Sequence, residues 1–436
     1  MSTIAEVRLW GRTIGAVSLE AGRDVAAFQY DASFSRSGIE VCPLMMPLGS
    51  RVYSFDALPA RTFHGLPGLL ADSLPDRFGN ALIDAWLATQ GRTSESFNAV
   101  ERLCYTGVRG MGALEFQPGL GPAPRRARNI DIDALIALAS EILDERRNIR
   151  ASFKGRSRKD ALNDILRVGT SAGGARAKAV IAWNRDTGEV RSGQVEAGSG
   201  FEYWLLKFDG VAGNSDKELA DPLGYGSVEY AYALMARDAG VRMSECRLLE
   251  EHGRRHFMTR RFDRGPNGEK VHMQSLCAIA HFDFNSAGAH SYEQAFDIAR
   301  RLGLGSGAVE ELFRRMTFNI VARNQDDHVK NIAFLMDKTG SWSLAPAFDL
   351  TWSYNPGGAW TAQHQMTMNG KRDEFTLADF RACGKSAMLK RGRAEIIVAD
   401  VCAVVSHWLK YARLADVPAA WRKQIQRTHR LTFPAG

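Results

Sequence analysis

The first 60 residues carry short runs of apolar side chains separated by polar turn signals. The runs AEVRLWG, TIGAVSLE and DVAAFQYD are divided by Gly, Asp and Arg, a pattern typical of strands. Residues 66–91 then change to helical spacing, with Leu82, Trp86 and Leu87 on one face and Gly91 as a stop signal. The pattern therefore predicts a β-rich start followed by a helix.

Residues 166–210 return to strand-like runs, which flank a glycine loop. From about residue 224 onward helical spacing dominates, in stretches that begin at Ser227, Ser291 and Ala308 and again in 392–413. A β-rich front and a helical back predict an α+β layout with a cleft between the two parts.

A cluster of polar residues, NQDDHVKN at 324–331, precedes two strand-like runs. NIAFLMD and WSLAPAFD are separated by a turn that contains Gly340. Because Gly340 lies midway between Asn331 and Asp349, a hairpin folded there is expected to bring those two residues opposite one another. An amide oxygen and a carboxylate suit Mg²⁺, and Asp326 just upstream can accept a hydroxyl proton. The alternative is that these are capping and turn residues.

Two further features accompany this polar cluster. The glycines of VGTSAGGARAK, residues 168–178, allow backbone N–H groups to cradle phosphates, although glycine hairpins are common and the GK[ST] ending of a P-loop is absent. Lys207 ends an apolar strand and needs an anionic partner, either a nucleotide phosphate or a structural carboxylate. Glu229 either orients that lysine or stabilises the start of its own helix.

Composition narrows the class of protein. The chain has 436 residues, 45% apolar, with a net charge of +7, which allows an acidic partner without requiring one. Six scattered cysteines without a CxxC pair favour reduced thiols in a cytoplasmic protein. No apolar signal-peptide core follows the N-terminus, and IIVADVCAVVSHWLKYA is interrupted by Asp400 and His407, which favours an amphipathic helix over a membrane span.

A zinc site is the competing interpretation of a histidine pair. His252 and His256 lie four residues apart, with Cys246 nearby, but the segment lacks convincing third and fourth ligands. In chain order, a glycine loop, a strand lysine, a helix glutamate, an Asp/Asn loop and a final Asp follow the logic of a two-lobed, protein-kinase-like phosphotransferase. The HRD and DFG signatures of protein kinases are absent.

The motifs together resemble the HipA family of serine/threonine kinases, the toxin halves of bacterial toxin–antitoxin pairs. NQDDHVKN fits the family's N-x-D-x-H-x-K-N catalytic loop at each fixed position, and LAPAFDL fits its metal-binding segment. SAGGARAK is similar to its glycine loop, LPGLLADSLPDRFG to a segment of its N-terminal half, and RRFDR to its nucleotide hinge. The resemblance extends from the first strands to about residue 415.

The resemblance implies a role for each matching residue. Asp326 is the expected catalytic base, with Lys207 on the ATP phosphates and His328 and Lys330 shaping the catalytic loop. Asn331 and Asp349 are expected to hold Mg²⁺, and Ser171 is the expected autophosphorylation site. The remaining residues expected at ATP are those of the glycine loop and the hinge: Gly173, Gly174, Ala175, Arg176, Ala177, Lys178, Arg260, Arg261 and Phe262. His328 is also expected at the nucleotide.

The resemblance also implies domains and partners. Residues 1–122 are expected to form a β-rich N-terminal subdomain, 123–264 a nucleotide-binding lobe, and 265–436 a helical lobe with the catalytic loop. The Pro- and Arg-rich stretch 121–129 is the linker candidate. The expected partners are a small helix-turn-helix antitoxin, operator DNA reached through it, and a protein substrate from translation, with aminoacyl-tRNA synthetases among the family's targets; no membrane is expected.

Two alternatives stay open at this point. The chain could be a small-molecule kinase on a related fold, or a catalytically silent, kinase-shaped partner of a DNA-binding repressor. The basic stretch 145–160, with seven basic and two acidic side chains, is either a solvated face or a binding patch. Together with 123–128 and 389–393 it is a candidate for DNA contact in a complex. Residues 277–290 fit the family poorly and are candidates to face the protein substrate.

Overall fold

The structure, a computed structural model, describes residues 2–121, 135–137, 139, 176–194, 197–211, 215–216, 219–220, 223–266 and 268–436. Ser171, Gly173, Gly174 and Ala175 lie outside the described residues, as do the basic stretches 123–128 and 145–160. Most of a helix expected over 130–150 also lies outside them.

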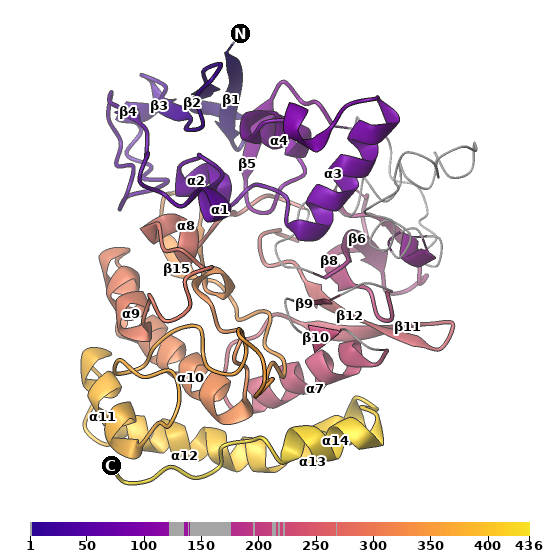
Figure 1. The fold of residues 1–436 in the computed structure, drawn as a ribbon, viewed down its shortest axis with the longest axis vertical. Helices are drawn as coiled ribbons and strands as arrows, with labels where there is room; N and C mark the ends of the chain where they lie inside the picture. Colours follow the sequence, from indigo (N-terminus) through magenta and orange to yellow (C-terminus); the bar gives the residue numbers. More distant parts are fainter. Residues whose placement is uncertain are drawn as a thin grey trace.

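The N-terminal part is an antiparallel sheet with short helices beside it (Figure 1). The strands follow the order β4-β3-β2-β1-β5. The elements are β1 Thr3–Leu9, β2 Arg12–Leu19, β3 Ala27–Tyr30, η1 Phe34–Arg36, β4 Val52–Tyr53, α1 Ala60–Phe63, α2 Gly68–Ala71, α3 Arg77–Thr89, η2 Ser94–Ser96, α4 Ala99–Thr106 and β5 Leu114–Gln117.

The expected helix over 66–91 is two helices, α2 and α3. Pro75 separates them, since the residue before a proline disfavours helical backbone. Asp76 then caps α3, because its side chain accepts the N–H of Gly79 at 2.6 Å. The expected strands of the first 60 residues are confirmed as β1, β2 and β3.

A second antiparallel sheet has the order β11-β12-β8-β6-β7 and packs against helix α7. Its two flanking short strands, β9 and β10, pair with each other. The bounds are β6 Lys178–Asn184, β7 Val190–Ser192, β8 Phe201–Lys207, β9 Ser215–Asp216, β10 Leu219–Ala220, α7 Tyr225–Asp238, β11 Cys246–Glu251 and β12 Arg254–Arg260.

The C-terminal lobe is mainly helical and contains a small sheet of order β13-β14-β15. The elements are β13 His272–Ser275, α8 Leu276–Ala280, α9 Tyr292–Arg301, α10 Ser306–Ala322, η3 Val329–Asn331, β14 Ala333–Met336, β15 Trp342–Leu344, α11 Leu377–Ser386, α12 Arg393–Ser406, α13 Trp408–Leu414 and α14 Ala419–Gln426. The single helix expected over 392–413 is interrupted at His407, which ends α12 and precedes α13.

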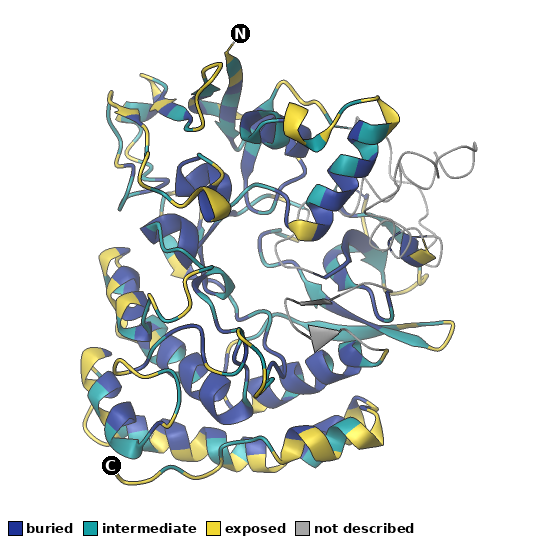
Figure 2. Cartoon of the chain, viewed as in Figure 1, coloured by how far each residue is buried: buried dark blue, intermediate teal, exposed yellow. Residues whose placement is uncertain are grey.

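Buried side chains join these parts into two main cores. The larger core runs from the N-terminal sheet to the C-terminal helices, and Figure 2 shows α10 and the face of α12 toward it as buried. In the smaller core Phe78 and Leu82 of α3 pack with Ile181 and Trp204 of the second sheet. Helix α3 therefore links the N-terminal part directly to strands β6 and β8. Among the helices of the described ranges, none is long and apolar enough to cross a membrane.

A buried carboxylate links the second sheet to the N-terminal part. Asp263 contacts Arg261 at 2.6 Å and Arg264 at 2.8 Å, and it accepts the N–H of Gly112 at 2.7 Å. Burial alone would raise the pKa of Asp263, but the two arginines outweigh it and lower that pKa strongly. The carboxylate is therefore ionised and is the counter-charge of two largely buried guanidinium groups.

We expect Asp263→Ala to lower the free energy of unfolding by about 3–5 kcal/mol, because it leaves buried arginine charge without its partner. The urea midpoint of unfolding measures this loss. Asp186→Ala, which changes an exposed residue in the β6–β7 turn, is the matched control and should leave the midpoint unchanged. Equal midpoints for the two variants would show that Asp263 has no such structural role.

Candidate functional site

The candidate site is centred on Lys207, the last residue of β8. Its Nζ lies 2.5 Å from Oε1 of Glu229, which is buried on α7. The same Nζ is bonded to Oδ1 of Asp349, a residue 142 positions further along the chain. The lysine side chain is 12% exposed, so one cation joins two carboxylates in a nearly closed site.

The electrostatics of this cluster keep Lys207 and Asp349 charged. Burial would lower the pKa of Lys207, but Asp349 and Glu229 outweigh it and raise that pKa. Burial would likewise raise the pKa of Asp349, but Lys207, Lys178 and Arg176 lower it. If one of the two carboxylates binds a cation instead of the lysine, the lysine can bind a phosphate oxygen.

Asp349 has an unusual backbone for a residue that is not glycine. Its φ is +54°, in the left-handed region, where Asp is tolerated better than most residues. Its carbonyl accepts Nδ2 of Asn324 at 3.4 Å. The ring of Phe348 lies 5.8 Å from that of Phe262 between centroids. The segment that carries Asp349 is therefore packed between the expected catalytic loop, residues 324–331, and the expected hinge.

The expected hairpin is confirmed, but the expected pairing of Asn331 with Asp349 is wrong. Strands β14 and β15 pair Phe334 with Leu344, and Ala345 extends the ladder by donating to the Ala333 carbonyl at 3.0 Å. Pro346 follows and has no N–H to continue the ladder. In this register Asn331 would face Ala347, and Asn331 itself lies in η3 rather than on a strand.

The catalytic loop places Asn331 beside Asp326. Nδ2 of Asn331 donates to the Asp326 carbonyl at 2.9 Å, which leaves the amide oxygen of Asn331 to accept a cation. Nε2 of His328 lies 3.9 Å from Oδ1 of Asp326. Nζ of Lys330 lies 5.2 Å from the centroid of the Phe284 ring. The four loop residues expected at the site are thus gathered together.

The neighbouring Asp327 anchors this loop. It is fully buried and accepts the Tyr292 hydroxyl at 2.7 Å and the Gln365 N–H at 2.7 Å, with Nδ1 of His364 at 2.9 Å. Burial would raise the pKa of Asp327, but His364 and the hydrogen bonds lower it. The two adjacent aspartates therefore differ: Asp327 is buried among structural hydrogen bonds, and Asp326 is the one that the resemblance assigns to chemistry.

The described end of the glycine loop lies against the Lys207 cluster. The Arg176 guanidinium lies 3.5 Å from Oε2 of Glu229 and 3.6 Å from the Tyr225 ring centroid. Ala177 is buried in the smaller core. Lys178 begins β6 directly opposite Lys207, and its Nζ lies 3.0 Å from Oδ2 of Asp76. Two lysines thus face each other across the strands, with carboxylates beside each.

The expected hinge is built around structural ion pairs. Arg260 lies 3.5 Å from Glu202, and Arg261 is held by Asp263 through two hydrogen bonds. The N–H of Arg261 donates to the Tyr203 carbonyl at 2.9 Å. Of these three residues, Phe262 is the one that contacts the segment of Asp349.

Cys246 and His256, two of the residues considered for zinc, do not share a face of the sheet. His256 is buried, and its Nδ1 accepts the Asp209 N–H at 2.9 Å. Cys246 pairs with Thr259 across the strands, while His256 pairs with Leu249, so the two side chains point to opposite faces of the sheet. Within the described ranges, no group of three His, Cys, Asp or Glu side chains could hold a metal ion.

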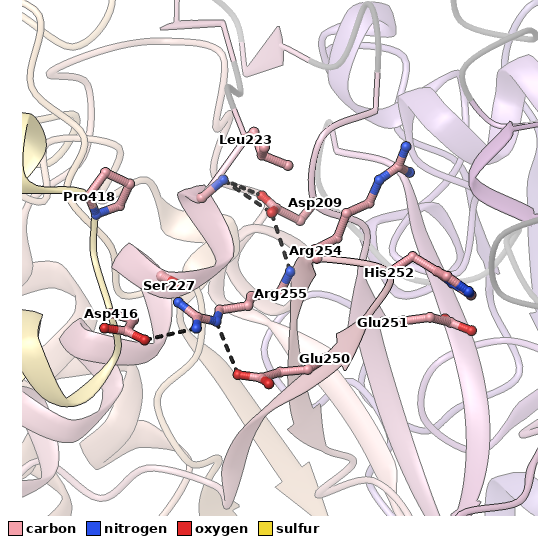
Figure 3. A pocket seen from close by; sticks show the side chains of 12 residues that line it. Asp209, Leu223, Ser227, Glu250, Glu251, His252, Arg254, Arg255, Asp416 and Pro418 are labelled. Atoms are coloured by element: carbon pink, nitrogen blue, oxygen red, sulfur yellow. Dashed lines mark hydrogen bonds and ion pairs between the residues drawn. The ribbon is translucent and has the colours of Figure 1, made fainter.

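A pocket of about 440 Å³ lies near the start of α7, away from the expected site residues (Figure 3). Asp209 accepts the Gly224 N–H at 2.9 Å, and Arg255 bridges Glu250 at 3.0 Å and Asp416 at 2.8 Å. Asp209 accepts from the amides of Gly224, Tyr225 and Gly226, so its carboxylate already occupies the position that an anion would take at this helix start.

The donor set fits a magnesium nucleotide. Asn331 and Asp349 offer hard oxygen ligands of the kind Mg²⁺ prefers, together with few enough protein ligands to leave room for phosphate and water. Lys207 supplies a positive charge beside Asp349. Asp326, whose backbone carbonyl accepts from Asn331, supplies a carboxylate in the same loop. This arrangement can hold a charged phosphate group and accept a proton next to it.

Sequence reasoning missed Asp76 and Trp360. The indole N–H of Trp360 donates to Oδ1 of Asp326 at 2.6 Å. The helix-capping position of Asp76 after Pro75 was a detectable signal for a cap, but its contact with Lys178 was not detectable. Trp360 lies in a loop whose sequence, NPGGAWTAQH, gives no sign of contact with residue 326.

Comparison with known proteins identifies the family of the chain. Residues 170–408 match the HipA-like C-terminal domain, and residues 5–117 match the HipA N-terminal domain. HipA of Shewanella oneidensis MR-1, solved with HipB and its operator DNA, has a TM-score of 0.67 and 17% identity over 97% of this chain and 96% of that chain.

The proinflammatory kinase CtkA of Helicobacter pylori has a TM-score of 0.32 and 12% identity over 51% of this chain and 87% of that chain. No curated protein sequence matches significantly. The expected α+β, two-lobed, kinase-like fold is confirmed. Since the C-terminal domain match alone covers more than half of the residues, the chain belongs to the HipA family.

Proposed function

We propose that this protein is an ATP- and Mg²⁺-dependent serine/threonine protein kinase, the toxin component of a toxin–antitoxin pair in the cytoplasm. One observation carries the proposal: Lys207 of β8, Glu229 of α7 and Asp349 of the loop after β15 meet in a single ion-paired cluster. A lysine paired with a helix glutamate beside a metal-binding aspartate is the arrangement that phosphoryl transfer in kinases requires. Membership of the HipA family supports the same activity.

In this proposal each residue has one task. Lys207 binds the ATP phosphates, and Glu229 orients Lys207. Asn331 and Asp349 hold Mg²⁺, which supplies charge neutralisation on the phosphates when bound. Asp326 accepts the proton of the serine or threonine hydroxyl. The loop from Gly173 to Lys178 covers the nucleotide, and Arg260 to Phe262 contact the adenine.

The protein acceptor is proposed to meet the loop after α8. Phe284 in this loop lies 5.5 Å from the His328 ring between centroids and forms the cation–π contact with Lys330. Asn285 donates to Thr62 of the N-terminal part at 2.9 Å. The loop thus reaches from the N-terminal part to the catalytic loop, where a protein acceptor such as a translation component would approach.

The partners are proposed from the family. HipA of Shewanella oneidensis is solved with HipB and operator DNA. By analogy we propose a small helix-turn-helix antitoxin that binds this chain and carries it to operator DNA. If the basic stretches 123–128, 145–160 and 389–393 touch DNA in that complex, its affinity for DNA should fall steeply with salt.

An acceptor screen separates this function from that of a small-molecule kinase. ATP labelled on the γ-phosphate is incubated with the protein and Mg²⁺, in parallel with extract proteins and with aminoglycosides or lipids as acceptors. We expect label in an extract protein on serine or threonine. Label confined to a small molecule would show that the protein is a small-molecule kinase and not a protein kinase. The absence of label in every acceptor would refute the proposed function.

Ser171 is proposed as a self-inhibition site. A phosphate there adds about −1.5 to −2 charges next to the ATP phosphates, so repulsion is expected to displace the glycine loop and stop turnover. We expect the intact mass to increase by one phosphate after incubation with Mg·ATP, and the Ser171→Ala protein to show no such increase. A mass increase that persists in Ser171→Ala would show that the phosphate is on another residue.

A further inference from the structure

The segment 360–365 forms hydrogen bonds with three consecutive residues of the catalytic loop. Nε2 of Gln325 donates to the Ala362 carbonyl at 3.1 Å, and the N–H of Gln365 donates to Oδ1 of Asp327 at 2.7 Å. Between these two contacts, Trp360 donates its indole N–H to Oδ1 of Asp326 at 2.6 Å. The segment therefore contacts the expected catalytic base and both of its neighbours.

The segment 360–365 is itself held in place by burial and hydrogen bonds. Thr361, His364 and Gln365 are buried. Nε2 of Gln365 donates to the Trp360 carbonyl at 2.5 Å and to the Gln325 carbonyl at 3.1 Å. This side chain therefore links the backbone of the segment to the backbone of the catalytic loop. A segment with buried side chains and bonds on both sides is a rigid support rather than a mobile lid.

The direction of the Trp360 hydrogen bond determines what it can do. An indole N–H only donates, so it stabilises a carboxylate acceptor and fixes the rotation of that carboxylate about its last bond. A base that must receive a proton from a hydroxyl acts only when its oxygen is held in the correct place, and small misplacements are costly.

We infer that Trp360 is a positioning residue that orients the Asp326 carboxylate for proton transfer from the acceptor hydroxyl. The inference rests on the proposed kinase function and assigns Trp360 no contact with substrate. Its effect is transmitted through one hydrogen bond, so removal of the N–H with retention of an aromatic ring should be enough to lose it.

The test compares Trp360→Phe with Trp10→Phe in steady-state phosphoryl transfer. Trp10 also donates its indole N–H at 2.8 Å, to the Lys270 carbonyl, which is not part of the catalytic loop, so it is a matched control. We expect Trp360→Phe to lower kcat roughly 10–100-fold, the range typical of lost orienting contacts, with KM for ATP unchanged. Trp10→Phe should match the wild type.

A double-variant cycle shows whether Trp360 acts through Asp326. In an Asp326→Ala background, Trp360→Phe should cause no further loss of kcat. An equal loss in both backgrounds, or wild-type kcat in Trp360→Phe, would overturn the positioning role and leave the kinase function standing. Absence of transfer by the wild-type protein would instead overturn the kinase function, and the positioning role with it.

Discussion

Asp326→Ala should reduce phosphoryl transfer by roughly 10²–10⁴-fold, the usual contribution of a general base. Asp326 lies beside Asn331 and receives the Trp360 hydrogen bond, and in the proposed function it accepts the proton of the acceptor hydroxyl. KM for ATP should change little, because Asp326 is not expected to bind the nucleotide. The measurement is the initial rate with γ-labelled ATP, with Asp186→Ala as the control for an exposed carboxylate.

Asp326→Asn sharpens the interpretation. Asparagine keeps the volume of aspartate and an oxygen that can accept from Trp360, but it cannot take up the proton. A loss as large as that of Asp326→Ala would therefore assign the effect to proton transfer. If both variants transferred phosphate at the wild-type rate, Asp326 would not be the base. If the wild-type protein itself transferred none, a binding-only role as the partner of a repressor would be the better account.

Asp349→Asn should lower turnover by roughly 10²–10³-fold, the range for loss of one preorganised electrostatic contact in a site, and should also weaken the binding of Mg·ATP. The variant removes the only carboxylate in the expected metal pair and one of the two counter-charges of Lys207. Glu229 remains on the lysine, so the fold should persist. Titration calorimetry with ATP, in Mg²⁺ and in EDTA, measures the binding.

The matched control is Asp337→Asn in the turn between β14 and β15. Asp337 is exposed, and its side chain accepts the N–H of Thr339 at 2.8 Å, a role that asparagine can also fill. This variant should bind and turn over ATP as the wild type does. If Asp349→Asn kept the Mg²⁺ dependence of ATP binding, the assignment of Asp349 to the metal would be wrong.

Local patterns in the sequence predicted the local structure well. The turn signals between Asp337 and Gly340 predicted the β14–β15 hairpin, because turn chemistry is read from adjacent residues. Helical spacing from Ser291 and Ala308 predicted α9 and α10. The pattern could not show where an amphipathic run breaks, as at His407, since the residues on both sides have the same spacing.

Contacts between distant segments could be anticipated only in part. The order of motifs implied that Lys207 and Asp349 share a site, but no local pattern gives the contact itself across 142 residues. The contacts of Trp360 with Asp326 and of Asp76 with Lys178 were not anticipated, because each partner has an ordinary local context. The register of the hairpin was misjudged because the strand pairs are centred on Thr339 rather than on Gly340, and Pro346 ends the ladder before Asp349.

A crystal structure of the wild-type protein with Mg²⁺ and a non-hydrolysable ATP analogue tests the central claim most directly. We predict Mg²⁺ bound by the amide oxygen of Asn331 and the carboxylate of Asp349, with the phosphates on Lys207 and the terminal phosphate facing Asp326. Nucleotide bound elsewhere, or a metal that touches neither Asn331 nor Asp349, would contradict the account.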